Sequence, residues 1–237
     1  MALPVWIRTP EELAALAEAL SGAGAVAVDT EADSLHHYPG KLCLMQIADD
    51  RGRAHLVDPL ALPTLAPLEP LFAEAGIVKI LHAADNDLAY LKRLWGFTVR
   101  SLFDTAVAAR LLGDTALSLD GLLARSLGLE PVKSGQKDDW SRRPLSREQE
   151  TYALNDVLHL IPLRERLIVE LEAKGRLAWV EEECAALAAL AVPDKVVDPD
   201  TYLRLKGARD LDRRGLAVLR ELHQAREALA LRLDRPP

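Results

Sequence analysis

The stretch VAVDTEADSL, at residues 26–35, decides the fold of this chain. Small and β-branched apolar residues run without interruption into two acids, Asp29 and Glu31. Because both faces of the preceding segment are apolar, the pattern predicts a strand in the centre of a sheet. Residues two positions apart on a strand point to the same face, so we expect the two carboxylates side by side. A buried strand that ends in a pair of acids needs something to neutralise them.

The segments after this strand predict an α/β fold. Two more strand patterns, at residues 41–49 and 53–59, are separated only by a short polar turn, so we expect an antiparallel meander. The pattern then alternates between strands and helices. These elements are a strand at 76–83, a helix at 85–96, a strand at 99–104 and a helix at 105–113. The order predicts a mixed central sheet flanked by helices.

Helical patterns fill much of the remaining sequence. Thr9 and Pro10 predict the start of an N-terminal helix, as its N-cap and its first helical residue. Further helices are predicted at 118–128, 146–175 and 177–190. We expect the long helix at 146–175 to be interrupted or kinked at Pro162, because proline lacks the N–H that a helix interior requires.

The chain divides into three predicted parts. Residues 1–192 form a main domain, residues 193–210 a linker, and residues 211–237 a C-terminal helical extension. Leucines recur at helical spacing in the last part, so this helix needs a partner surface. We interpret it as the start of a second helical domain.

Composition narrows the class of protein. The chain has 237 residues, 49% of them hydrophobic, and a formal net charge of −7, which predicts a globular core. It has no apolar run long enough to span a bilayer and no N-terminal secretory signal, and its two cysteines, Cys43 and Cys184, lie far apart in apolar surroundings. We therefore expect a cytoplasmic protein without a membrane partner. The net charge argues against non-specific coating of nucleic acid, but not against a nuclease whose acids hold metal ions.

Two further helices contribute acids. Asp87 lies in the first turn of the predicted helix at 85–96, at the edge of its apolar stripe. Tyr152 and Asp156 are four residues apart and therefore lie on one helical face. Buried carboxylates without a counter-charge are costly, and oxygen ligands without Cys or His suit Mg²⁺ or Mn²⁺. Four carboxylates fit two ions about 3.5–4 Å apart, the arrangement that clamps a reacting phosphoryl group.

Each of these patterns has a simpler interpretation when taken alone. An Asp-x-Glu sequence occurs by chance at strand ends, and Asp85 or Asp87 could be a helix N-cap. Tyr152 and Asp156 could be a half-buried aromatic residue beside a solvated acid. The metal interpretation depends on the order, the element type and the spacing together.

The same residues resemble the DEDD superfamily of 3′–5′ exonucleases, and within it the ribonuclease D family. Its first motif matches Asp29-Thr30-Glu31, and its second matches HAADNDLAYL, which selects Asp87 over Asp85. The third motif matches Tyr152 and Asp156 in its tyrosine form. The last segment, from residue 211, resembles the opening of the helical module called HRDC, of which the remainder is missing.

This resemblance implies a fold, a mechanism and a substrate. The fold is the RNase H-like exonuclease fold, and the cofactors are two divalent cations, Mg²⁺ or Mn²⁺. Asp29 bridges both ions, Glu31 and Asp156 complete the first, and Asp87 holds the second. Tyr152 orients the attacking water, because a phenol with an ordinary pKa is a poor base near neutral pH.

The implied substrate is the 3′ end of single-stranded RNA, tRNA precursors in particular, and the products are nucleoside 5′-monophosphates. An alternative within the superfamily is the degradation of short oligoribonucleotides, dinucleotides or DNA 3′ ends. A nuclease-like fold that only binds RNA is a third possibility, but such a fold would normally have lost one or more of the acids.

Several residues are candidates for contact with substrate. Thr30 lies within the first motif, Leu35 just past it, and His82 at the strand end beside the second motif. A core role is the alternative for Leu35 and His82. A polar loop at 131–146 carries basic residues suited to phosphates, with a solvated loop as the alternative. These basic residues are Lys133, Lys137, Arg142 and Arg143. Trp140, in the same loop, either stacks on a base or anchors the loop to the core.

Overall fold

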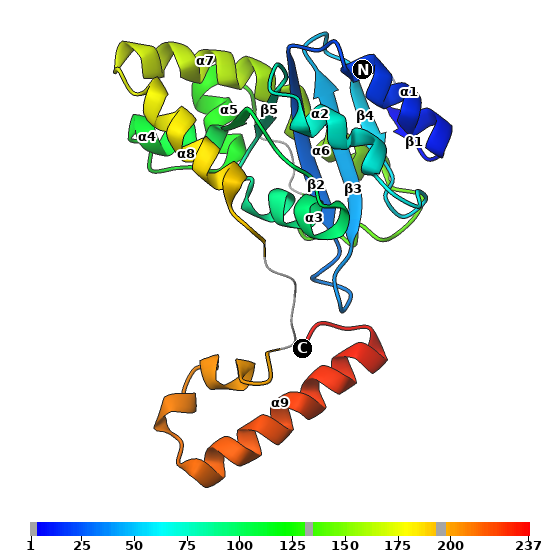
Figure 1. The fold of residues 1–237 in the computed structure, drawn as a ribbon, viewed down its shortest axis with the longest axis vertical. Helices are drawn as coiled ribbons and strands as arrows, with labels where there is room; N and C mark the ends of the chain where they lie inside the picture. The colour runs from blue at the N-terminus through cyan, green and yellow to red at the C-terminus, as the bar shows by residue number, and fades with distance from the viewer. Residues whose placement is uncertain (1–3, 131–134, 193–197) are drawn as a thin grey trace. The chain divides into compact units, whose positions relative to one another are not determined.

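The computed structural model describes residues 4–130, 135–192 and 198–237. A six-stranded mixed sheet lies at its centre, with the strand order β1-β4-β3-β2-β5-β6, and helices flank it (Figure 1). The strands are β1 (Val5–Ile7), β2 (Ala25–Ala32), β3 (Leu42–Asp49), β4 (Ala54–Val57), β5 (Val78–Leu81) and β6 (Leu102–Asp104). This architecture confirms the predicted α/β class.

The predicted meander is also confirmed. β2 pairs antiparallel with β3, and β3 with β4, whereas β5 and β6 join parallel to their neighbours. β2 is an interior strand, between β3 and β5, and its first four residues are fully buried or nearly so. The pairing with β5 ends at Ala27, so the acidic end of β2 continues past the end of its parallel neighbour.

The sheet belongs to the first of two compact units, which consists of residues 1–32 and 42–192. The helices of this unit are α1 (Pro10–Leu20), α2 (Glu69–Ala73), α3 (Asp85–Trp95), α4 (Thr105–Leu112), α5 (Leu119–Leu127), α6 (Arg147–Leu158), α7 (Leu160–Ala173) and α8 (Leu177–Ala189). Their ends follow the sequence signals. Thr9 caps α1 in a capping box with Glu12, and Ser146 caps α6 in the same way with Gln149. Gly96 closes α3 in the left-handed conformation, with φ of 68°.

The predicted interruption of the helix at 146–175 is present, but it lies three residues before Pro162. The helix at 146–175 is divided at His159, which ends α6 and begins α7. Pro162 is the third residue of α7, where the backbone N–H of a helix has no partner inside the helix. Proline is therefore tolerated there, and it cannot donate the bond to Leu158 that would continue α6 into α7.

Three short elements beside the central strands have no counterpart in the predictions. β1 has only three residues and pairs parallel with β4. A 3-10 turn, η1 (Ala66–Leu68), leads into α2, which has five residues. Segments of this length are too short to show a periodic pattern.

Helix α6 packs against β2, β3 and β4. Its residues Ala153 and Leu154 share a buried cluster with Leu44 and Leu56 of the sheet and with Trp140. By the strand register, Leu44 lies opposite Glu31, so this cluster covers the face of the sheet that carries the two acids. The strand period thus places Asp29 and Glu31 beneath α6.

A second compact unit consists of residues 33–41 and 193–237. Its described part contains two 3-10 turns, η2 (Thr201–Arg204) and η3 (Ala208–Asp210), and the helix α9 (Arg213–Leu233). Leu222 and Leu229 are exposed on α9. The division of residues 193–237 into a linker and the start of a further domain stays a prediction. Within the described parts of the chain, no helix is long and apolar enough to cross a membrane.

Candidate active site

Three of the predicted acids converge. Asp29 and Glu31 come from the end of β2, and Asp156 comes from α6, which covers that face of the sheet. Each side chain offers a carboxylate oxygen, and these atoms all lie within 4.8 Å of one another. Asp156 is at least 125 positions from the other two acids in the sequence, yet the three form one cluster.

Asp87 approaches the cluster from a different element. It lies in the first turn of α3 with only 7% of its surface exposed. The hydroxyl of Thr30, between the two acids of β2, donates a hydrogen bond to the Asp87 carboxylate. The simpler interpretation of Asp87 as an N-cap is excluded, because Ala84 occupies that position.

Asp104 holds the turn that leads into α3. Its buried carboxylate accepts hydrogen bonds from the backbone N–H groups of Ala83 at 3.1 Å and Ala84 at 2.8 Å. It also caps α4 through the N–H of Ala106. One carboxylate therefore joins the starts of two helices and fixes where α3 begins.

The clustered acids hold their protons strongly. Burial, followed by the charges of Asp87, Glu31 and Asp156, raises the pKa of Asp29 well above its usual range. Burial, followed by the charges of neighbouring carboxylates, raises the pKa of Glu31 to about 9. Burial raises the pKa of Asp156 to about 7. It raises the pKa of Asp87 to about 6, against the opposing effect of the hydrogen bond from Thr30.

This arrangement fits divalent cations. The charges that act most strongly on Asp29 and Glu31 all belong to other carboxylates, so no basic side chain of the described residues dominates their surroundings. Oxygen ligands of this kind, without sulfur or imidazole, suit Mg²⁺ or Mn²⁺. The structure does not distinguish between the two metals by its ligands, since both accept carboxylates.

Tyr152 lies beside the acids, one helical turn before Asp156. Burial, the nearby carboxylates and its hydrogen bond with Asp156 raise the pKa of its phenol far above the usual value. The phenol is therefore protonated at neutral pH and donates a hydrogen bond. Its ring packs at 6.1 Å from the ring of Trp140, and the backbone of Gly135 passes so close that an added Cβ would lie 3.1 Å from the Tyr152 ring.

A pocket surrounds these residues. Its lining includes Asp29, Thr30, Glu31, His82, Tyr152 and Asp156, together with Asn86, Ser118, Asp120 and Gln136. The last four are polar residues that the sequence did not mark as functional. Asp120 follows Ser118, the N-cap of α5, so its position in the sequence indicates only a helix start. The charge of Asp120 raises the pKa of Asp156, so Asp120 lies near the carboxylate cluster.

His82 is anchored by a hydrogen bond and also lines the pocket, while its contact with substrate stays a prediction. Its Nδ1 lies 2.9 Å from the hydroxyl of Thr105, which itself donates to the carbonyl of Leu81. Burial lowers the pKa of His82, so the ring is neutral near pH 7. The backbone of Leu117 makes a further hydrogen bond with the ring and partly opposes the effect of burial on its pKa. The ring is anchored and still lines the pocket.

The basic loop contains residues of two kinds. Arg142 is 80% exposed and pairs with Asp139 at 2.9 Å, and Lys137 is also exposed. Lys133 lies outside the described residues. Arg143 is different, and its predicted place among the phosphate-binding residues is wrong, because its guanidinium is already occupied by the protein.

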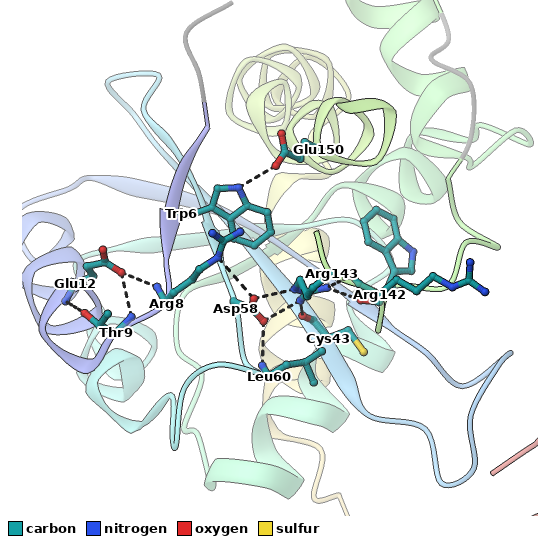
Figure 2. Close-up of polar contacts among 11 residues, drawn as sticks. Trp6, Arg8, Thr9, Glu12, Cys43, Asp58, Leu60, Arg142, Arg143 and Glu150 are labelled. Atoms are coloured by element: carbon teal, nitrogen blue, oxygen red, sulfur yellow. Dashed lines mark hydrogen bonds and ion pairs between the residues drawn. The ribbon is translucent and has the colours of Figure 1, made fainter. Parts of the chain in front are cut away.

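Figure 2 shows this guanidinium between the sheet and the loop. It binds both carboxylate oxygens of Asp58 at 2.8 Å and donates to the carbonyls of Cys43, Trp140 and Arg142 at 2.7–2.8 Å. Five bonds saturate the donors of an arginine side chain. Arg143 therefore fastens the loop to the sheet.

Trp140 is an anchor. It is fully buried in the cluster beneath α6, so it cannot stack on a base, and its ring supports Tyr152. Leu35 is 63% exposed in the loop after β2, which excludes a core role in this part of the chain. Its contact with substrate stays a prediction. Both cysteines are buried, and neither forms a disulfide.

Comparison with known proteins agrees with this geometry. The family model described as 3′–5′ exonuclease matches residues 4–172, which include all four acids and Tyr152. The chain belongs to the 3′–5′ exonuclease family. The resemblance to ribonuclease D is confirmed by curated relatives. Ribonuclease D of Desulfotalea psychrophila is 34% identical over 231 residues, covering 97% of this chain and 62% of the relative, and that of Gluconacetobacter diazotrophicus is 38% identical over 235 residues, covering 98% and 59%.

Solved structures of the family have the same fold. The catalytic core of RRP6 from Trypanosoma brucei superposes with a TM-score of 0.87 at 30% identity, covering 100% of this chain and 67% of that one. Escherichia coli RNase D superposes with a TM-score of 0.80 at 31% identity, covering 99% and 62%. Brucella melitensis NrnC, solved with bound Mg²⁺, superposes with a TM-score of 0.68 at 27% identity, covering 79% and 90%. The chain spans about three fifths of the length of the two ribonuclease D relatives.

Proposed function

We propose that this chain is a metal-dependent 3′–5′ exoribonuclease, which removes nucleoside 5′-monophosphates one at a time from the 3′ end of single-stranded RNA. The observation that carries the proposal is the convergence of Asp29, Glu31 and Asp156, with ligand atoms within 4.8 Å, in a pocket that also contains Tyr152. The similarity to ribonuclease D supports RNA as the substrate. We propose tRNA precursors as the substrate class.

Asp29, Glu31, Asp87 and Asp156 would hold two divalent cations, Mg²⁺ or Mn²⁺. When bound, the cations would lower the pKa of the attacking water and stabilise the charge on the leaving oxygen. In the hydrolysis, the water oxygen bonds to phosphorus and the bond from phosphorus to the 3′ oxygen of the preceding nucleotide breaks. That oxygen takes up a proton and becomes the new 3′ hydroxyl.

Tyr152 would position the attacking water. Its pKa is raised by burial and by the surrounding carboxylates, so the phenol keeps its proton and cannot act as a base. A protonated phenol can hydrogen-bond to water and fix the direction of attack. Trp140 and the loop around Gly135 hold the ring in place on two sides.

Substrate would be held by residues around the pocket. His82 and Thr30 line it, and the exposed Arg142 and Lys137 lie in the loop that supports Tyr152. We propose that these basic residues, with Lys133, contact phosphates of the incoming strand. Leu35 would contact the terminal base.

The test is an assay on 5′-labelled single-stranded RNA with Mg²⁺ or Mn²⁺, repeated with a chelator. We expect stepwise shortening from the 3′ end that the chelator abolishes and that Asp29→Asn does not show. A tRNA with a 3′ trailer, a dinucleotide and single-stranded DNA, assayed in parallel, would identify the preferred substrate. Stable binding of RNA without cleavage, or cleavage at the parent rate by Asp29→Asn, would contradict the proposal.

A further inference from the structure

Gln46 is a polar residue in the buried interior of the sheet. It lies in the middle of β3, a strand whose other residues from Leu42 to Ala48 are apolar, and its side chain is fully buried. Neither the nitrogen nor the oxygen of its amide has a hydrogen-bond partner among the described residues. Since a buried amide without partners destabilises a fold, an apolar residue would serve better if packing were the only requirement.

The strand register gives Gln46 one polar neighbour. It lies directly opposite Asp29 on β2 and opposite Leu56 on β4. Residues paired in this way point to the same face, with Cβ atoms about 4.5–5.5 Å apart. The Gln46 side chain therefore leaves the sheet beside that of Asp29, on the face that α6 covers, while its other neighbour is apolar.

Asp29 has capacity to accept such a bond. A carboxylate can accept about four hydrogen bonds or metal contacts. The bond that acts on Asp29 within the protein comes from the backbone N–H of Thr30. A neutral amide can donate to a carboxylate without competing as a cation for the same site.

We infer that Gln46 is a positioning residue for Asp29, whose amide N–H donates to the Asp29 carboxylate once cations are bound and directs its remaining oxygens toward them. The inference rests on the proposed function, because it requires cations at the carboxylate cluster. Groups that hold metal ligands in this way contribute to affinity, and their loss typically weakens metal binding by about 10–100-fold.

The test measures Mn²⁺ affinity by titration calorimetry and the melting temperature without metal, using Gln46→Met in the full chain. Methionine has a similar volume and no N–H donor. We expect Mn²⁺ affinity to fall about 10-fold, while the metal-free melting temperature stays the same or rises, because an unsatisfied amide has been removed. Leu56→Met is the matched control, since it alters the other neighbour of Gln46, and it should leave Mn²⁺ affinity unchanged.

Gln46→Leu provides a second variant that also lacks the N–H donor and adds no metal ligand. It should weaken Mn²⁺ binding as well. Parent-like or tighter Mn²⁺ binding by Gln46→Leu would overturn the inference, and so would a lower metal-free melting temperature with unchanged affinity in Gln46→Met. If the parent chain itself binds no Mn²⁺, the proposed function fails first, and this inference fails with it.

Discussion

The hydroxyl of Thr30 donates a hydrogen bond to the carboxylate of Asp87 and so joins the end of β2 to the first turn of α3. Thr30 lies between Asp29 and Glu31 on the strand, and its hydroxyl reaches α3. The first motif of the family therefore has two roles. Its acids face α6, and the residue between them holds the acid of the second motif.

Replacing Thr30 by valine should lower the rate of RNA shortening about 10-fold, as expected for loss of a group that orients a metal ligand. The hydrogen bond from Thr30 lowers the pKa of Asp87, so its loss should move the acidic limb of the pH–rate profile to higher pH. Thr151→Val is the matched control, because its hydroxyl bonds to the carbonyl of Arg147 on the surface of α6. An unchanged pH–rate profile in Thr30→Val would show that the hydrogen bond from Thr30 to Asp87 does not affect the reaction.

Replacing Tyr152 by phenylalanine should separate reaction from metal binding. We expect the rate to fall about 100-fold, in the range for loss of a group that positions a proton or water, while Mn²⁺ affinity stays close to that of the parent. Tyr202→Phe, in the second unit, controls for loss of a phenol elsewhere. Parallel loss of activity and of Mn²⁺ binding would instead make Tyr152 part of the metal site.

Stability should depend on pH and metal together. The unfolded chain ionises its acids near pH 4, whereas the metal-free fold keeps protons on Asp87, Asp156 and Glu31 up to about pH 6, 7 and 9. The folded state thus binds more protons across this window, so metal-free stability should fall as pH rises from about 5 to 8.

Divalent cations should reverse this loss. At about 100 times its dissociation constant, a ligand stabilises by about 2.7 kcal/mol, which corresponds to a rise of roughly 5–10 °C in melting temperature for a unit of this size. The rise should be large near pH 8 and small near pH 5, because protons compete with cations for the carboxylates. Thermal melts with Mg²⁺ or with chelator would measure it. If the melting temperature near pH 8 were the same with Mg²⁺ as with chelator, the proposed metal site would be contradicted.

Of two adjacent arginines, Arg143 should affect stability and Arg142 should affect RNA binding. Arg143→Met leaves the buried Asp58 without its main partner and should cost roughly 3 kcal/mol of stability. Arg142→Ala should hardly change stability, because its ion pair is exposed. It should instead weaken RNA binding and reduce the salt dependence of affinity by about one phosphate contact. Binding isotherms at several salt concentrations and thermal melts of both variants would test the assignment.

Gly135→Ala should disturb Tyr152 directly. The new methyl group would lie 3.1–3.2 Å from two atoms of the tyrosine ring, closer than ordinary packing allows. Either the loop or the ring must move, so we expect a lower turnover rate with Mn²⁺ binding retained. A turnover rate equal to that of the parent would show that the loop adjusts without moving the phenol.

Much of the site follows from local periodicity. The strand period places Asp29 and Glu31 on one face, and the helix period places Tyr152 and Asp156 on another, without knowledge of the fold. The break in the helix at 146–175 was not predictable in the same way. Proline is the usual local signal, but here Pro162 occupies a first-turn position, and the break occurs at His159.

The sequence by itself determined the types of the longer elements, the antiparallel meander and the pairs of acids that share a face, because these depend on residues close together in the chain. Only the tertiary structure decided which distant groups meet. It brings Asp156 to Asp29, places Gln46 beside that acid, and assigns Arg143 to Asp58 although it looks no different in sequence from Arg142. The physical reason is that side-chain partners across a sheet depend on register and packing, which bring together groups that no local pattern connects.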